Sequence, residues 1–149
     1  MAETAHEVTT IEQTVRIAAS PATVWQFWTD PTLVVEWFGA AADVEPEPGG
    51  LYRVVMETGQ VMRGAVVELD PPRRLVFTFG WEGNPPGEPL APGTTNVEVT
   101  LEPDEQGTVL TLRHTAMPVT HAPDHRKGWA HLVGERLVAA AEATAGAPT

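Results

Sequence analysis

The sequence contains no cysteine, and it has only one serine, Ser20, and one lysine, Lys127. Without cysteine the chain cannot form disulfides, thiolate metal sites or iron–sulfur clusters, and it has no thiol nucleophile. Ser20 precedes Pro21 at the start of an apolar helical pattern, which is typical of a helix N-cap and argues against a serine hydrolase. Lys127 stands beside Arg126, and we interpret it as a solvated side chain rather than a Schiff-base former. The glycine motifs that bind dinucleotides and phosphates are also missing.

Basic residues are scarce, since nine Lys and Arg stand against twenty Asp and Glu and the net charge is −11. Apart from two adjacent pairs they are scattered singly, so the chain has no basic stripe to follow a phosphate backbone. We therefore expect neither nucleic acid nor an anionic membrane as a partner. No apolar run approaches the ~18 residues of a membrane helix, and the first residues lack the basic and apolar regions of a signal peptide. A cytoplasmic protein is the simplest interpretation.

Apolar residues are present in sufficient number to build one core. The 149 residues include 42% hydrophobic residues and five tryptophans. This length falls near the usual size of one domain, roughly 100 to 150 residues. We therefore expect a single domain over residues 1–149, with its core at about 8–144.

Residue patterns predict the order of the elements. Residues 8–17 alternate between apolar and polar, which indicates a half-buried strand. Ser20 and Asp30 each precede a proline and predict two short helices. Turn-forming residues then separate strands that we place at 42–46, 50–57, 61–70, 74–81, 95–102 and 108–116.

Two further segments complete the pattern. Residues 83–93 hold four prolines and three glycines, so they predict a long loop, which we expect at the mouth of a site. Residues from about 120 to 144 have apolar side chains at helical spacing and predict one long amphipathic helix. Gly128 within it is a poor helix former, which suggests that the helix passes close to another backbone there.

This order of elements predicts an α+β fold. A curved antiparallel sheet of six to seven strands wraps around the long C-terminal helix, and the two short helices close one end. Such an arrangement leaves room for a hollow between the sheet and the helix.

Several local motifs carry a family resemblance. They include Ser20-Pro21, Thr29-Asp30-Pro31, Trp37-Phe38-Gly39, Gly49-Gly50, Pro71-Pro72-Arg73-Arg74, Leu110-Thr111-Leu112 and Gly128-Trp129. Over about residues 11–141 the chain resembles the START/Bet v1-like (SRPBCC) superfamily, in the branch similar to the C-terminal domain of the activator of Hsp90 ATPase. The resemblance implies a helix-grip fold with an apolar pocket between the sheet and the last helix. Because the matched residues are mostly caps, turns and core positions, it specifies fold more than function.

Strand parity and helical spacing select the residues that we expect to line this pocket. They are Trp37, Phe38, Tyr52, Val54, Met56, Phe77, Phe79, Trp81, His114, Trp129, Leu132 and Val133. The competing interpretation is that these side chains simply fill the core. His114 is the one inward imidazole. It either recognises a ligand or acts as a general base, or else it is a structural residue satisfied by a backbone carbonyl or by Tyr52.

No cofactor and no metal are expected. His121 and His125 are four residues apart, a spacing that suits metal ligation on a helix. The pattern nevertheless lacks the H-E-x-x-H glutamate and an evident third ligand, and Pro123 suggests that His121 precedes the helix. The carboxylates form no convincing catalytic pair.

The leading functional hypothesis is noncovalent binding of a small apolar or aromatic molecule, with sequestration or transport as its purpose. A second hypothesis, implied only by the resemblance, is a co-chaperone-like module that contacts an Hsp90-type chaperone. A third is a cyclase-like enzyme in which His114 or Tyr52 moves protons. Of these, the sequence favours binding over catalysis.

Overall fold

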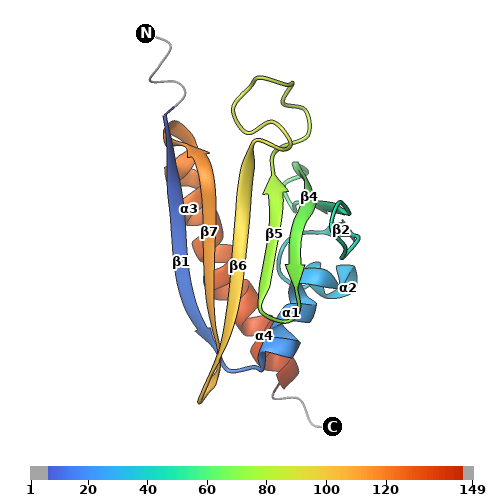
Figure 1. Ribbon diagram of the computed structural model, residues 1–149, viewed down its shortest axis with the longest axis vertical. Coiled ribbons are helices and arrows are strands. Elements are labelled where there is room, and N and C mark those ends of the chain that lie inside the picture. Colours follow the sequence, from blue (N-terminus) through green and yellow to red (C-terminus); the bar gives the residue numbers. More distant parts are fainter. Residues whose placement is uncertain (1–6, 146–149) are drawn as a thin grey trace.

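The chain folds around one curved antiparallel sheet and one long C-terminal helix, which confirms the predicted architecture (Figure 1). The computed structural model describes residues 7–145, so the ends of the predicted 1–149 domain lie outside the described residues. Neighbouring strands all pair antiparallel, in the order β1-β7-β6-β5-β4-β3-β2. The strands are β1 (Val8–Ile17), β2 (Ala41–Val44), β3 (Leu51–Val55), β4 (Val61–Asp70), β5 (Arg74–Phe79), β6 (Thr95–Asp104) and β7 (Gly107–Pro118).

The two short helices begin where their caps predict. The Ser20 hydroxyl accepts a hydrogen bond from the first turn of α1 (Pro21–Thr29), and the Asp30 carboxylate accepts one from the first turn of α2 (Pro31–Val34). Each cap satisfies a backbone N–H that has no partner within the helix. The aromatic residues that follow α2 lie in turns, so this helix is shorter than the pattern suggests.

The C-terminal helix is continuous but not uniform. A 3₁₀ turn, η2 (Val119–His121), leads into α3 (Ala122–His131), which is followed by a π-helical segment, η3 (Leu132–Leu137), and then by α4 (Val138–Ala145). The sequence predicts the helix but not its π segment, because side-chain periodicity does not distinguish an extra residue within one turn. No helix within residues 7–145 combines the length and the apolar character needed to cross a membrane.

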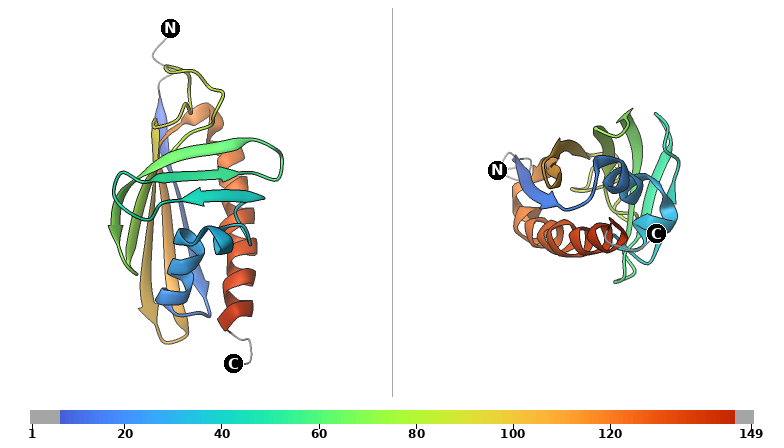
Figure 2. Two further views of the ribbon diagram at one scale, coloured as in Figure 1. Left: turned by 90° about the vertical axis from the view of Figure 1, so that its right-hand side faces the viewer. Right: turned by 90° about the horizontal axis from the view of Figure 1, so that it is seen from below.

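The helix runs along the concave side of the sheet (Figure 2). The hairpin of β3 and β4 reaches toward the helix, while α1 and α2 lie at one end of the space between sheet and helix. Eight side chains that strand parity places on the concave face are at most 3% exposed: Tyr52, Val54, Leu75, Phe77, Phe79, Leu110, Leu112 and His114. Met56 and Trp81, predicted to share that face, lie beyond the ends of β3 and β5 and are only partly buried. The concave face of the sheet and the helix together therefore enclose the core.

Candidate functional site

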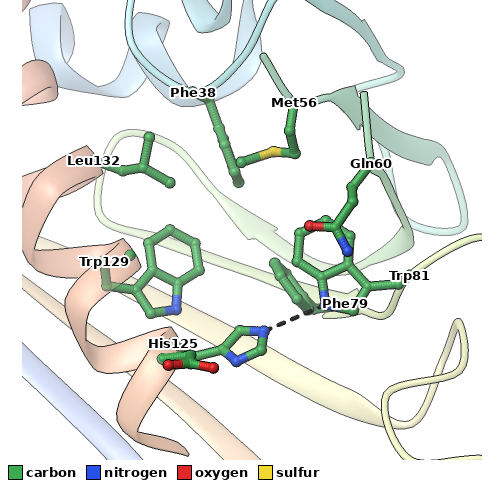
Figure 3. A pocket seen from close by; sticks show the side chains of 10 residues that line it. Phe38, Met56, Gln60, Phe79, Trp81, His125, Trp129 and Leu132 are labelled. Carbon is green, nitrogen blue, oxygen red and sulfur yellow. Dashed lines mark hydrogen bonds between the residues drawn. The ribbon is translucent and has the colours of Figure 1, made fainter. Parts of the chain in front are cut away.

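A cleft opens between the C-terminal helix and the hairpin of β3 and β4 (Figure 3). The volume of its inner part is about 200 Å³, and that of an adjoining outer part is about 310 Å³. Phe79, Asp124, His125 and Trp129 line only the inner part. The residues common to both parts are Phe38, Met56, Gln60, Trp81, Gly128 and Leu132.

Aromatic rings that pack against one another form the walls of the inner part. The Trp129 ring lies with its centroid 5.6 Å from that of Phe38 and 6.0 Å from that of Phe79. The Phe79 ring also packs edge to face on Trp81, at 5.3 Å. Edge-to-face contacts at such separations are favourable and hold each ring in one orientation. The cleft is therefore bounded by preformed π surfaces.

The twelve residues selected from the sequence divide into two groups. The first group lines the cleft and consists of Phe38, Met56, Phe79, Trp81, Trp129 and Leu132. The second group is fully buried, at 0% exposure, and does not line it: Trp37, Tyr52, Val54, Phe77, His114 and Val133. Strand parity and helical spacing identify inward-facing residues in both groups, but the second group belongs to the packed core.

Tyr52 illustrates the core group. Its ring stacks on Phe77 with centroids 4.0 Å apart and an angle of 6° between the planes. Its hydroxyl donates a 2.6 Å hydrogen bond to the backbone carbonyl of Trp28. Burial raises the pKa of the phenol. Tyr52 is therefore a neutral structural donor that does not line the cleft.

His114 is held by a chain of buried hydrogen bonds rather than by Tyr52. The Trp129 indole N–H donates to His114 Nδ1 at 3.0 Å, so Nδ1 is an acceptor and the ring proton lies on Nε2. Nε2 then donates to the Thr95 hydroxyl at 2.8 Å, and this hydroxyl donates to the Phe79 carbonyl at 2.7 Å. Burial, with a smaller contribution from His125, lowers the pKa of His114 to about 3. The imidazole is thus neutral and fully satisfied.

His125 forms a second tryptophan–histidine pair, at the edge of the cleft. Its Nε2 accepts a hydrogen bond from the Trp81 indole N–H at 3.3 Å, drawn as a dashed line in Figure 3, and its Nδ1 donates to the His121 carbonyl at 2.9 Å. Burial is the main cause that lowers the pKa of His125. Both ring nitrogens of His125 are therefore occupied, and His121 contributes its backbone rather than its imidazole.

The next feature is whether His121 and His125, which are four residues apart, could bind a metal ion together. Over residues 7–145, no three or more His, Asp or Glu side chains gather closely enough to hold a metal ion. His121 belongs to the 3₁₀ turn and precedes α3, as Pro123 suggests. The helical spacing alone therefore does not create a ligand set here.

Sequence reasoning missed four residues that line the inner part of the cleft: Gln60, Asp124, His125 and Gly128. Gln60 follows the β3–β4 turn, where no periodic pattern predicts direction. Asp124 and Gly128 share a helix face with Leu132 at a spacing of four residues, and this signal is visible in the sequence. The expected close backbone approach at Gly128 is wrong, since no neighbouring element within residues 7–145 comes within 4 Å of a Cβ built there.

The mouth of the cleft is formed by the β3–β4 turn and not by the 83–93 loop. Glu57, in this turn, pairs with Arg136 of η3 at 3.0 Å, and both side chains line the outer part. The loop instead lies at one end of the sheet, between β5 and β6 (Figure 1). Some of its residues line a separate hollow together with the start of β1. The expectation that the proline-rich loop closes the site is therefore wrong.

Comparison with solved structures supports the fold. A protein from Mesorhizobium loti has a TM-score of 0.80 and 23% identity, and the match covers 91% of this chain and 98% of that one. DynU16, from the dynemicin biosynthetic locus, has a TM-score of 0.77 and 26% identity. That match covers 91% of this chain and 48% of DynU16, so this chain spans about half the length of that protein. The comparison with curated proteins finds no match.

Two matches define the family. The AHSA1-like protein of Rhizobium etli is 38% identical, with a TM-score of 0.70, over 94% of this chain and 84% of its own. The model of the Activator of Hsp90 ATPase homolog 1-like proteins matches residues 18–142. The helix-grip architecture described above is that of the Bet v1-like (SRPBCC) superfamily, to which these proteins belong. The chain therefore belongs to the family of Activator of Hsp90 ATPase homolog 1-like proteins.

Proposed function

We propose that the protein binds a small, largely apolar molecule noncovalently in the cleft between the C-terminal helix and the β3–β4 hairpin. The walls are aromatic rings, a thioether and a leucine side chain, as is typical of ligand pockets. The indole N–H groups of Trp81 and Trp129 already donate to histidines. An apolar ligand can therefore enter without leaving these indole donors unsatisfied.

The main support for this proposal is the open space beside Gly128 in the wall of the cleft. A glycine inside a helix costs up to ~1 kcal/mol relative to alanine. No neighbouring element within residues 7–145 occupies the position of its missing Cβ, and Gly128 lines both parts of the cleft. The absent methyl group thus leaves space in the cleft, and this space is a reason to retain a residue that weakens the helix.

The relatives supply a setting for such binding. DynU16 belongs to a biosynthetic locus. A protein that sequesters or carries a hydrophobic product would serve such a setting, and we propose the same kind of role here. The acid–base alternative has less support, because neither His114 nor Tyr52 lines the cleft. The co-chaperone alternative rests on the family resemblance alone.

Binding and stability of Gly128→Ala test the proposal. The added methyl group should stabilise the helix by up to ~1 kcal/mol and narrow the cleft. We expect urea unfolding to show the gain in stability, and tryptophan fluorescence with a panel of planar apolar compounds to show weaker binding. Amide resonances of residues 56, 79–81 and 125–132 report the location of the ligand.

Gly134→Ala is the matched control, because Gly134 lies on the same helix but does not line the cleft. Its added Cβ would lie 2.9 Å from the end of the flexible Gln13 side chain, which can move aside. Ligand affinity should therefore be the same as in the wild type. Equal affinity in Gly128→Ala and the wild type, or no response to any compound, would contradict the proposal.

A further inference from the structure

Charge at the cleft is unevenly distributed. The exposed Asp124 side chain lines the inner part, and it takes part in no salt bridge among residues 7–145. Arg136 is the guanidinium of the outer part, and its charge is matched by Glu57 at 3.0 Å. Arg126 and Lys127 follow on the same helix but do not line the cleft. The remaining fixed charge of the lining is therefore negative.

The histidines of the lining do not reverse this balance. Burial keeps His125 neutral near pH 7, since it lowers the pKa of this imidazole. His131, in the outer part, lies beside Glu135, with Nδ1 3.6 Å from the carboxylate. The inner part is thus a largely aromatic space that also holds the Met56 thioether and the neutral Gln60 amide, with one carboxylate, Asp124, at its rim.

Two tryptophan rings belong to the aromatic walls, and their indole N–H groups do not point to a ligand. Trp81 and Trp129 lie on opposite sides of the cleft, with Phe38 and Met56 on a third side and His125 on a fourth (Figure 3). Both indole N–H groups are engaged by histidines. A cation within about 6 Å of an aromatic face is attracted by the ring quadrupole, and tryptophan is the strongest of these rings. The net charge of −11 adds a long-range attraction for cations.

We propose that the ligand of this cleft is cationic: a quaternary ammonium or protonated amine on an apolar body, held between Trp81 and Trp129 with Asp124 at the rim. The inference rests on the proposed function, because it names the ligand class of the same cleft. An anionic ligand would face the uncompensated carboxylate, and a neutral one would leave the attraction of the ring faces for a cation unused.

Two probes of the same shape test the charge directly. Phenyltrimethylammonium and tert-butylbenzene differ in having a cationic nitrogen or a neutral carbon at the branch point. We expect tryptophan fluorescence and amide chemical shifts, measured on the full chain at fixed ionic strength, to give a Kd at least about tenfold lower for the ammonium. The shifts should fall on residues that line the cleft.

Two variants, each lacking one negative charge, show whether the preference for the ammonium comes from the cleft or from the overall charge of the protein. Asp124→Asn should lower the preference for the ammonium over tert-butylbenzene by about two- to fivefold. This is the change in affinity expected when the interaction energy of one exposed ion pair is lost. Glu105→Gln removes one negative charge in the turn between β6 and β7, away from the cleft, and should keep the wild-type preference. Equal losses in the two variants would show that the overall charge, and not the cleft, attracts the cation, which overturns the inference.

The outcomes separate this inference from the proposed function. If tert-butylbenzene binds as tightly as the ammonium or more tightly, the cationic ligand is wrong while binding in the cleft stands. If neither probe binds and the apolar panel also gives no response, the proposed function fails and the inference fails with it.

Discussion

Mild acid should destabilise the protein through His114. This side chain is 0% exposed, and both of its nitrogens are engaged in buried hydrogen bonds. Its pKa is about 3 in the folded protein, against about 6.5 for an unperturbed histidine. Between these two values the unfolded chain binds a proton that the folded protein does not. The stability linked to His114 is therefore fully present above pH 6.5 and is lost progressively as the pH falls toward 3.

The size of the effect follows from linkage. A difference of one pKa unit corresponds to about 1.36 kcal/mol. Between pH 7 and pH 5 the unfolded chain goes from about one quarter protonated to almost fully protonated at this position, so the folded protein should lose about 2 kcal/mol from His114 alone. This loss is a large fraction of a total stability of roughly 5–15 kcal/mol.

Urea unfolding of the wild type and His114→Gln at pH 7 and pH 5 measures this contribution. The variant should be less stable at pH 7, because its hydrogen bonds change, but its further loss at pH 5 should be about 2 kcal/mol smaller. His125 acts in the same direction and is present in both proteins, so its contribution cancels in the comparison.

The same pH dependence in the wild type and His114→Gln would refute the assignment of a neutral, buried His114. If His114→Gln does not fold, nitrogen NMR of the wild-type imidazole provides an independent test. The Nε2–H tautomer should persist at pH 5, and a protonated ring at that pH would refute the argument equally.

Two further predictions concern the core and the mouth of the cleft. Trp37→Phe should cost about 1–2 kcal/mol more in urea unfolding than Trp28→Phe. The Trp37 indole donates to the Phe27 carbonyl at 2.7 Å, whereas the buried Trp28 indole nitrogen has no hydrogen-bond partner among residues 7–145. Equal costs would contradict this assignment. Glu57→Gln should change stability by at most ~1 kcal/mol, because its pair with Arg136 is at the surface, yet should speed ligand release in stopped-flow fluorescence. An unchanged release rate would mean that the pair does not restrain the mouth.

Much of the fold could be predicted because local rules act on it directly. Alternation identified the inward residues of β3, β5 and β7, and the Ser20 and Asp30 caps fixed the starts of α1 and α2. These features depend on neighbours in the sequence, so they can be recognised without the structure.

The candidate site was less predictable because it depends on how elements meet. Parity says that Phe77 and Phe79 both point inward, but only packing decides that Phe77 stacks on Tyr52 while Phe79 reaches the cleft. Likewise, the partners of His114 come from β6 and from the helix, and no spacing in the sequence connects them. Strand parity therefore gives the face of a residue and not its distance from a cavity.

The π segment has a consequence for how the C-terminal helix tolerates change in length. Asp124 and Glu142 are eighteen positions apart, which would be five complete turns of a regular helix and would place both on one face. The π segment lies between them and takes up about one residue more in its turn, so Glu142 is rotated by roughly a quarter turn. Glu142 accepts a hydrogen bond from the Ala18 backbone N–H at 2.9 Å. Deleting one residue within 133–135 would turn this anchor away from Ala18, while the helix residues that line the inner part of the cleft, up to Leu132, would keep their orientation. A change in length just after Leu132 therefore alters the attachment of the helix at Ala18 without rotating the inner wall of the cleft.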